Sequence, residues 1–111
     1  MTLPTIELKN KIIMIDAAEL TDNDFLRQFE LKVDDELGKI EYSLQDRKIF
    51  LTKLIIPECL YCEEFEDDFL KLVFDNISER NISVVPTSPE IARFMRRNRK
   101  YKNMLPVGIR I

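Results

Sequence analysis

The hydrophobic pattern of this chain changes its period once, after Pro57, and this change limits the possible folds more than any other feature. Upstream, apolar and polar residues alternate in residues 29–33 and 40–44, with the period of half-buried strands. Downstream, apolar residues recur at every third or fourth position across residues 63–78, which predicts an amphipathic helix. The pattern therefore predicts an antiparallel meander followed by a helix that packs against it.

Two segments nearer the N-terminus carry shorter patterns. Residues 5–8 and 11–15 are rich in β-forming residues and predict a short hairpin. Residues 22–27 predict one turn of helix, with Thr21 or Asp22 as its cap.

The last strand expected in the meander spans residues 48–56 and follows a polar turn at residues 45–47. It becomes continuously apolar at Leu54, Ile55 and Ile56, which is typical of a strand covered on both faces. We therefore expect this strand to lie in the interior of the sheet.

The residues after the long helix predict a further unit of strand, turn and helix. A strand is expected over residues 82–85, after Asn81 as a left-handed helix cap. Pro86 and Pro89 then bracket a tight turn, in which Ser88 is a natural N-cap with a proline at the first helical position. The buried face of this second helix is expected to consist of Ile91, Phe94 and Met95.

Several short motifs resemble those of the very short, single-domain GNAT-like N-acetyltransferases. The matching segments are Phe29-Glu30-Leu31-Lys32-Val33, Gly38-Lys39-Ile40-Glu41-Tyr42, Pro57-Glu58, Val84-Val85-Pro86-Thr87-Ser88-Pro89, Arg96-Arg97 and Tyr101. The resemblance implies an α+β fold, in which an antiparallel-dominated sheet carries two main helices. It covers residues 29–102 of a single domain spanning 1–111, after an N-terminal extension of 1–28. The tail, 103–111, lies outside the match and is expected either to add a final strand or to lie over a groove.

The resemblance also implies acetyl-coenzyme A as a cofactor, lying against the splayed end of the last meander strand. It assigns cofactor contacts to Leu54, Ile55, Ile56, Glu63, Glu64 and Phe65, and catalytic positions near the thioester to Ser88 and Tyr101.

One departure from the family concerns the phosphate-binding loop. The family's glycine-rich loop should follow Pro57-Glu58, but the chain has only two glycines, Gly38 and Gly108. Six carboxylates lie instead between Glu58 and Asp68, and this segment contains no Lys or Arg. Two like charges about 4 Å apart repel by roughly 4 kcal/mol at an effective dielectric of about 20. This exceeds the contribution of a helix dipole, which reaches about 2 kcal/mol.

The other departure concerns the reactive side chain. Ser88 stands where the family has a cysteine, and the chain has no histidine to activate a hydroxyl. Both departures favour a GNAT-like domain with a degenerate acyl-coenzyme A site and little or no catalysis. One alternative is an active N-acetyltransferase with an altered phosphate contact. Another is an interaction module or dimer that uses the acidic residues 58–68 and the basic residues 93–102.

Simpler structural interpretations compete with these hypotheses. The carboxylates suit the positive end of a helix dipole, and we favour a solvated helix start for them. Ser88 is favoured as a helix cap over a catalytic group. Cys59 and Cys62 form a C-x-x-C pair, which could be a redox dithiol or half of a zinc site. Two ordinary thiols are favoured over both, and no metal site is predicted.

The charge of the chain also limits which kinds of partner are expected. A net charge of −3 gives no general attraction to nucleic acid or membranes. The basic run 93–102 is a solvated helix end or a patch for phosphate or acidic groups. Only Tyr101 in it supplies a ring for base stacking, so nucleic acid is not favoured as a partner. We expect a cytoplasmic protein with an unidentified protein partner or self-association.

Overall fold

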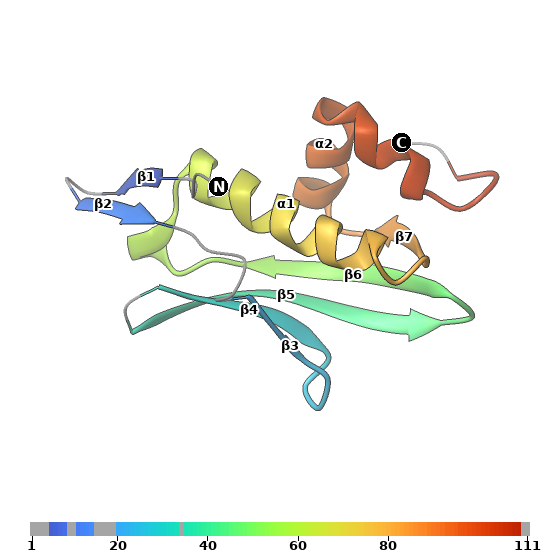
Figure 1. The fold of residues 1–111 in the computed structure, drawn as a ribbon, viewed down its shortest axis with the longest axis horizontal. Helices are drawn as coiled ribbons and strands as arrows, with labels where there is room; N and C mark the ends of the chain where they lie inside the picture. Colours follow the sequence, from blue (N-terminus) through green and yellow to red (C-terminus); the bar gives the residue numbers. More distant parts are fainter. Residues whose placement is uncertain (1–4, 9–10, 15–19, 34, 110–111) are drawn as a thin grey trace.

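A five-stranded sheet forms the main part of this computed structural model, which describes residues 5–8, 11–14, 20–33 and 35–109. Its strands are β3 (Leu20–Asn23), β4 (Gln28–Val33), β5 (Glu36–Gln45), β6 (Lys48–Ile55) and β7 (Ser83–Pro86), in that spatial order. Neighbouring strands are antiparallel, except that β6 and β7 are parallel. The helices α1 (Glu63–Ser78) and α2 (Pro89–Arg97) both lie on the same side of the sheet (Figure 1). The predicted fold class is thereby confirmed.

The strand pattern of the sequence is confirmed in most segments. The expected N-terminal hairpin is present as β1 (Thr5–Leu8) and β2 (Lys11–Met14), which pair antiparallel in a separate two-stranded sheet. Ile15, which was assigned to its second strand, lies outside the described residues. The polar turn before β6 is tight, because Asp46 and Arg47 both have left-handed φ angles, of 48° and 63°.

The helical turn predicted for residues 22–27 is wrong, because this segment ends β3 and turns into β4. Asp22 is held in the strand by two distant groups, the hydroxyl of Tyr42 and the guanidinium of Arg80. The side chain of Asn23 accepts a hydrogen bond from the Leu26 amide, which stabilises the turn. Local capping preferences therefore give way to contacts that only the folded chain can make.

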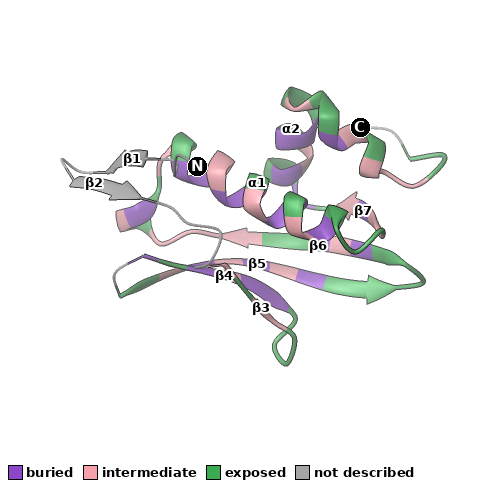
Figure 2. Ribbon diagram, viewed as in Figure 1, coloured by how far each residue is buried: buried purple, intermediate pink, exposed green. Residues whose placement is uncertain are grey.

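The strand β6 lies in the interior of the sheet, between β5 and β7, which confirms that prediction. The expectation that both of its faces are covered is wrong, because its buried residues alternate with half-buried or exposed ones. Its last pair with β7 joins Leu51 to Pro86, and Thr87 then closes the ladder by donating two hydrogen bonds, from its amide and its hydroxyl, to the Leu51 carbonyl. On the other side, a bulge leaves Thr52 unpaired in the register with β5. Residues 54–56 run beyond the end of β7 and are therefore only half-buried (Figure 2).

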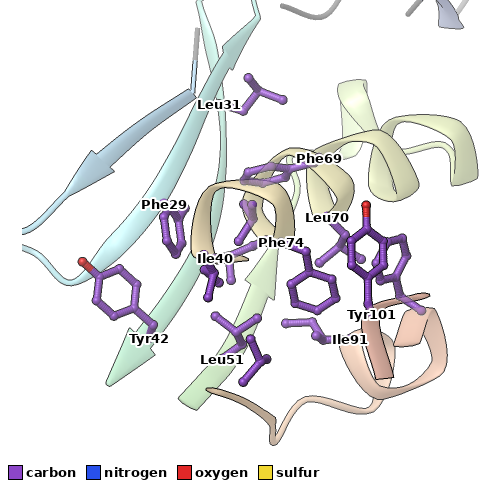
Figure 3. Close-up of a cluster of buried hydrophobic side chains, with 14 of the residues drawn as sticks. Phe29, Leu31, Ile40, Tyr42, Leu51, Phe69, Leu70, Phe74, Ile91 and Tyr101 are labelled. Carbon is purple, nitrogen blue, oxygen red and sulfur yellow. The ribbon is translucent and has the colours of Figure 1, made fainter. Parts of the chain in front are cut away.

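The core lies between the helices and the sheet. The α1 side chains that face the sheet are Phe65, Phe69, Leu70, Val73, Phe74 and Ile77, all fully buried. They meet sheet residues such as Phe29, Ile40 and Leu51 (Figure 3). Gly38 of β5 lets α1 approach closely, since a Cβ there would lie 3.1 Å from Phe69 Cε2.

The C-terminal part follows the predicted order of strand, turn and helix. Asn81 has a left-handed φ of 57° in the turn after α1, and Pro89 is the first residue of α2. The predicted buried face of α2 is confirmed at Ile91, Phe94 and Met95. A 3₁₀ helix, η3 (Arg99–Met104), follows α2. The tail forms a turn rather than a final strand as far as residue 109, where the described chain ends.

Candidate functional site

Two adjoining cavities lie where β6 runs on past the end of β7. The smaller one, of about 180 Å³, is lined by Leu54, Ile56, Tyr61, Glu66 and Glu90. The larger one, of about 370 Å³, is lined by Tyr61, Glu63, Glu66, Arg93 and Arg97. Because they share Tyr61 and Glu66, we treat them together as one cleft. Its walls come from the end of β6, the first turn of α1 and the exposed side of α2.

A short connection positions Tyr61 at this cleft. After Pro57, the 3₁₀ helix η2 (Glu58–Leu60) buries Leu60 in the core and turns the chain toward α1. Tyr61 follows with 64% of its surface exposed. Cys62 is the N-cap of α1, and its Sγ accepts a hydrogen bond from the Phe65 amide at 3.3 Å. One of the free amides of the helix start is therefore already used within the protein.

Glu66 is the least expected member of the cleft. It was grouped with a solvated helix start, but only 9% of its surface is exposed, so that interpretation is wrong for this residue. It makes no hydrogen bond or ion pair with any other side chain in residues 20–33 and 35–109. Burial, and then the charge of Asp67, raise the pKa of Glu66, although Arg93 and Arg97 oppose the shift.

Arg97 brings positive charge to the acidic start of α1. Its guanidinium lies 3.2 Å from Glu63 Oε1 and 3.0 Å from Asp67 Oδ1. The acidic segment had been expected to lack compensation, because no basic residue is close to it in sequence. The packing of α2 beside α1 supplies one from 30 residues away. Both pairs lie at the surface, although the Asp67 side chain is half-buried, and each contributes only about 0–1 kcal/mol to stability.

Ser88 occupies the predicted N-cap position of α2, but its side chain does not cap the helix. Its backbone carbonyl accepts the Ala92 amide at 3.0 Å, whereas its hydroxyl donates to Glu90 Oε2 at 2.5 Å. This hydrogen bond is the main cause that lowers the pKa of Glu90. Ser88 is 5% exposed and lines neither cavity itself, but it holds the carboxylate of Glu90, which does.

Tyr101, the other predicted catalytic residue, belongs to the aromatic core (Figure 3). Its ring centroid lies 5.1 Å from that of Phe74 and 5.5 Å from that of Phe94. Its hydroxyl donates to Asp75 Oδ1 at 3.1 Å, and burial followed by the charge of Asp75 raises its pKa. Tyr101 lines neither cavity of the cleft, so the structure does not bring it to Ser88 there.

The structure places only some of the residues assigned to the cofactor at the cleft. Leu54, Ile56 and Glu63 line the cleft, whereas Ile55 and the exposed Glu64 do not. Phe65 is fully buried, and its amide is used by Cys62. Glu66, Glu90, Tyr61, Arg93 and Arg97 line it without having been assigned to the cofactor, and all but Glu90 lie in the segments 58–68 and 93–102 that were expected to meet partners. For Glu66 a signal was present, because it falls on the apolar stripe of α1, three residues before Phe69.

Cys59 and Cys62 are free thiols, both half-buried against the core. Within the described part of the chain, no group of three or more Cys, Asp or Glu side chains is placed to hold a metal ion. Of the helices in that part, none combines the length and the apolar character needed to cross a membrane.

The family assignment agrees with this geometry. A family model for GCN5-related N-acetyl-transferases matches residues 28–104, which is well over half of the chain. The chain belongs to this family. The match confirms the resemblance drawn from the short sequence motifs, and the parallel pair β6–β7 with its open end lies inside the matched region. A comparison with curated proteins found no match.

Proposed function

We propose that this member of the GCN5-related N-acetyltransferase family has a degenerate acyl-coenzyme A site and transfers acetyl groups slowly or not at all. The observation that carries the proposal is the acidic first turn of α1, where Glu63 and the buried Glu66 line the cleft. The family generally uses acetyl-coenzyme A, and a helix start of this kind is where a pyrophosphate would be bound by backbone amides.

The residues present do not fit a pyrophosphate. Each carboxylate within about 4 Å of a phosphate would repel it by roughly 4 kcal/mol at an effective dielectric of about 20. The helix dipole offsets about 2 kcal/mol at most. The Phe65 amide already binds Cys62, and Arg97 is paired with Glu63 and Asp67. The guanidinium of Arg97 is therefore matched by carboxylates before any ligand arrives.

The side chain at the expected catalytic position also lacks activation. The hydroxyl of Ser88 donates to Glu90, whose lowered pKa makes it a weak base. A serine in this arrangement is held in place without being made nucleophilic. This supports a role for Ser88 in positioning Glu90 rather than in acyl transfer.

A second candidate function is an active acetyltransferase with an altered phosphate contact. It is favoured by Arg93 and Arg97, which both line the larger cavity. For this function Arg97 would have to leave its two carboxylates and bind the phosphates.

Calorimetry with acetyl-coenzyme A and with free coenzyme A tests the proposal directly, together with transfer of labelled acetyl groups to a mixture of primary amines. We expect no saturable heat up to millimolar ligand and no transfer above the rate without protein. Saturable binding by the unmodified chain together with acetyl transfer would overturn the proposal and favour the second function.

A pair of matched variants identifies the cause. Glu63→Gln with Asp67→Asn frees Arg97, and we expect this double variant to gain affinity for coenzyme A. Glu58→Gln with Glu64→Gln removes the same charge from exposed positions that line neither cavity, and we expect it to remain without binding. If both variants gain equally, general charge rather than the cleft excludes the coenzyme.

Partners and location follow from different features. Arg96, Arg99 and Lys100 are exposed beside the Arg97 pairs and could meet an acidic partner or a second copy of the chain. A dimer of this kind should dissociate at high salt, which light scattering measures. The two free thiols support a cytoplasmic location.

A further inference from the structure

The cleft carries more negative than positive charge. The carboxylates of Glu63, Glu66 and Glu90 and the guanidiniums of Arg93 and Arg97 line it, and a fourth carboxylate, that of Asp67, pairs with Arg97. Two negative charges are therefore left unmatched. The smaller cavity has the greater excess of negative charge, because Glu66 and Glu90 line it and, among the residues that the structure describes, no Lys or Arg does.

Glu66 is the residue of the cleft that points most clearly to a cationic ligand. Only 9% of the surface of this residue is exposed, no described side chain pairs with its carboxylate, and that carboxylate is left to the two cavities that it lines. A partner for Glu66 can reach it through the two cavities that it lines. The raised pKa of Glu66 has the same physical cause, namely burial without sufficient compensation.

The remaining lining of the smaller cavity determines what kind of cation fits. Leu54 and Ile56 supply apolar walls, and Tyr61 supplies an aromatic ring at the entrance. A strongly hydrated metal ion would need several oxygen ligands in place of these walls. A cation that carries alkyl groups instead gains from apolar contact and from the face of an aromatic ring, while the carboxylates balance its charge.

We propose that the smaller cavity binds an alkylated ammonium ion of the choline type, with Glu66 and Glu90 as its counter-charges and Tyr61 against its methyl groups. This inference rests on the proposed function, because it assumes that an acyl-coenzyme A does not occupy the cleft. The ligand is bound and not acetylated, since a quaternary nitrogen has no proton to lose and no lone pair. The domain would then act as a receptor for such a ligand.

Choline is the probe, and 3,3-dimethylbutan-1-ol is its neutral counterpart of nearly the same shape. Binding is followed by titration of the backbone amide signals in two-dimensional NMR spectra at constant ionic strength. We expect choline to shift the amides of Tyr61, Glu66 and Glu90 in a saturable way. We expect the neutral alcohol to bind roughly tenfold more weakly or not at all, because it lacks the charge.

Matched variants separate the site from the overall charge. Glu66→Gln should weaken choline binding by about fivefold or more, whereas Glu64→Gln removes the same charge from an exposed position of the same turn and should leave it within about twofold. Tyr61→Leu keeps an apolar side chain and should weaken choline but not the alcohol. Unchanged signal dispersion in each variant shows that the fold is intact. A second readout is the pKa of Glu66, which choline should lower.

Three results would overturn the inference: no saturable shift with choline, equal binding of choline and the alcohol, or equal losses in Glu66→Gln and Glu64→Gln. The same spectra recorded with acetyl-coenzyme A keep the two proposals apart. If the coenzyme shifts these amides saturably and the chain also transfers acetyl groups, the proposed function is overturned. If neither the coenzyme nor choline does, only the inference is lost.

Discussion

Replacing Gly38 by alanine is the sharpest test of how the fold is held together. Gly38 lies in β5 directly beneath α1, and its φ is not in the left-handed region, so alanine can adopt its backbone. The added Cβ would lie 3.1 Å from Phe69 Cε2 and 3.4 Å from Phe65 Cε1. Both rings are fully buried, so they have little room to move away. The substitution therefore tests whether helix and sheet are already as close as their side chains allow.

Two opposing effects determine the free energy of unfolding. Overpacking a buried site by one methyl group typically costs about 1–3 kcal/mol. Replacing a glycine in a strand gains about 0.5–1 kcal/mol, because alanine restricts the unfolded chain. We therefore expect Gly38→Ala to be destabilised by about 0.5–2 kcal/mol. At roughly 4 °C for each kcal/mol, this lowers the Tm by about 2–8 °C.

Urea unfolding followed by far-UV circular dichroism measures this change, since the chain has no tryptophan to report by fluorescence. Phe69→Leu removes the ring atoms that the new methyl group would meet, and it serves as a second background. We expect Gly38→Ala to stabilise that background by about 0.5–1 kcal/mol, which gives a coupling energy of about 1–3 kcal/mol. An equal cost in both backgrounds, or a stabilised single variant, would refute the close approach as the reason for the glycine.

Three further predictions concern charge and the backbone. Tyr42→Phe removes a hydrogen bond to the Asp22 carboxylate and should lower the free energy of unfolding by about 1–2 kcal/mol at neutral pH. Burial, and then the hydrogen bond to Asp22, raise the pKa of Tyr42 from 10.0 to about 12, so the folded state keeps a proton that the unfolded state loses. The free energy of unfolding should therefore fall as the pH rises from 10.0 to about 12. The fall should be larger in the unmodified chain than in Tyr42→Phe, by up to about 2–3 kcal/mol. Parallel curves of unfolding free energy against pH for the two proteins would contradict this. Arg47→Gly relieves a left-handed φ of 63°, so it should increase the free energy of unfolding by about 0.5–1 kcal/mol and raise the Tm. An unchanged Tm would show that the turn is unstrained. Glu66→Gln should be more stable than the unmodified chain at neutral pH, because a raised carboxyl pKa means that stability is lost as the pH rises, and the difference should close as the pH falls below 4.5. A difference that stays constant with pH in thermal unfolding would contradict this.

The parts of the fold that the sequence predicts are those governed by local periodicity. The alternation in β4 and β5 and the stripe of α1 each require one face to be apolar, and this pattern can be read without knowing the neighbours. Residues 22–27 could not be assigned in this way. The groups that hold Asp22 in a strand are Tyr42 and Arg80, which lie 20 and 58 residues away along the chain.

The candidate site was harder to predict for a related reason. Arg97 and Glu63 are neighbours only because α2 packs beside the start of α1, so composition alone showed an acidic segment without compensation. Glu66 was misjudged because its charge was given more weight than its place on the apolar stripe. A charged residue on such a stripe is buried by the fold whether or not it finds a partner, and this makes it a better indicator of a site than the exposed carboxylates beside it.

Family membership and chemistry are thus encoded by different residues in this chain. The cleft exists because β7 stops at Pro86 while β6 continues, and the hydrogen bonds that the amide and hydroxyl of Thr87 donate to the Leu51 carbonyl set this end point. These contacts do not depend on which side chains line the cavity. The carboxylates of Glu63, Glu66 and Glu90 therefore set the charge of the lining without setting the fold. A single observation distinguishes this view from one in which the fold itself excludes coenzyme A. If removing the carboxylates of Glu63 and Asp67 restores binding while the unfolding free energy changes by less than about 1 kcal/mol, the lining alone is responsible.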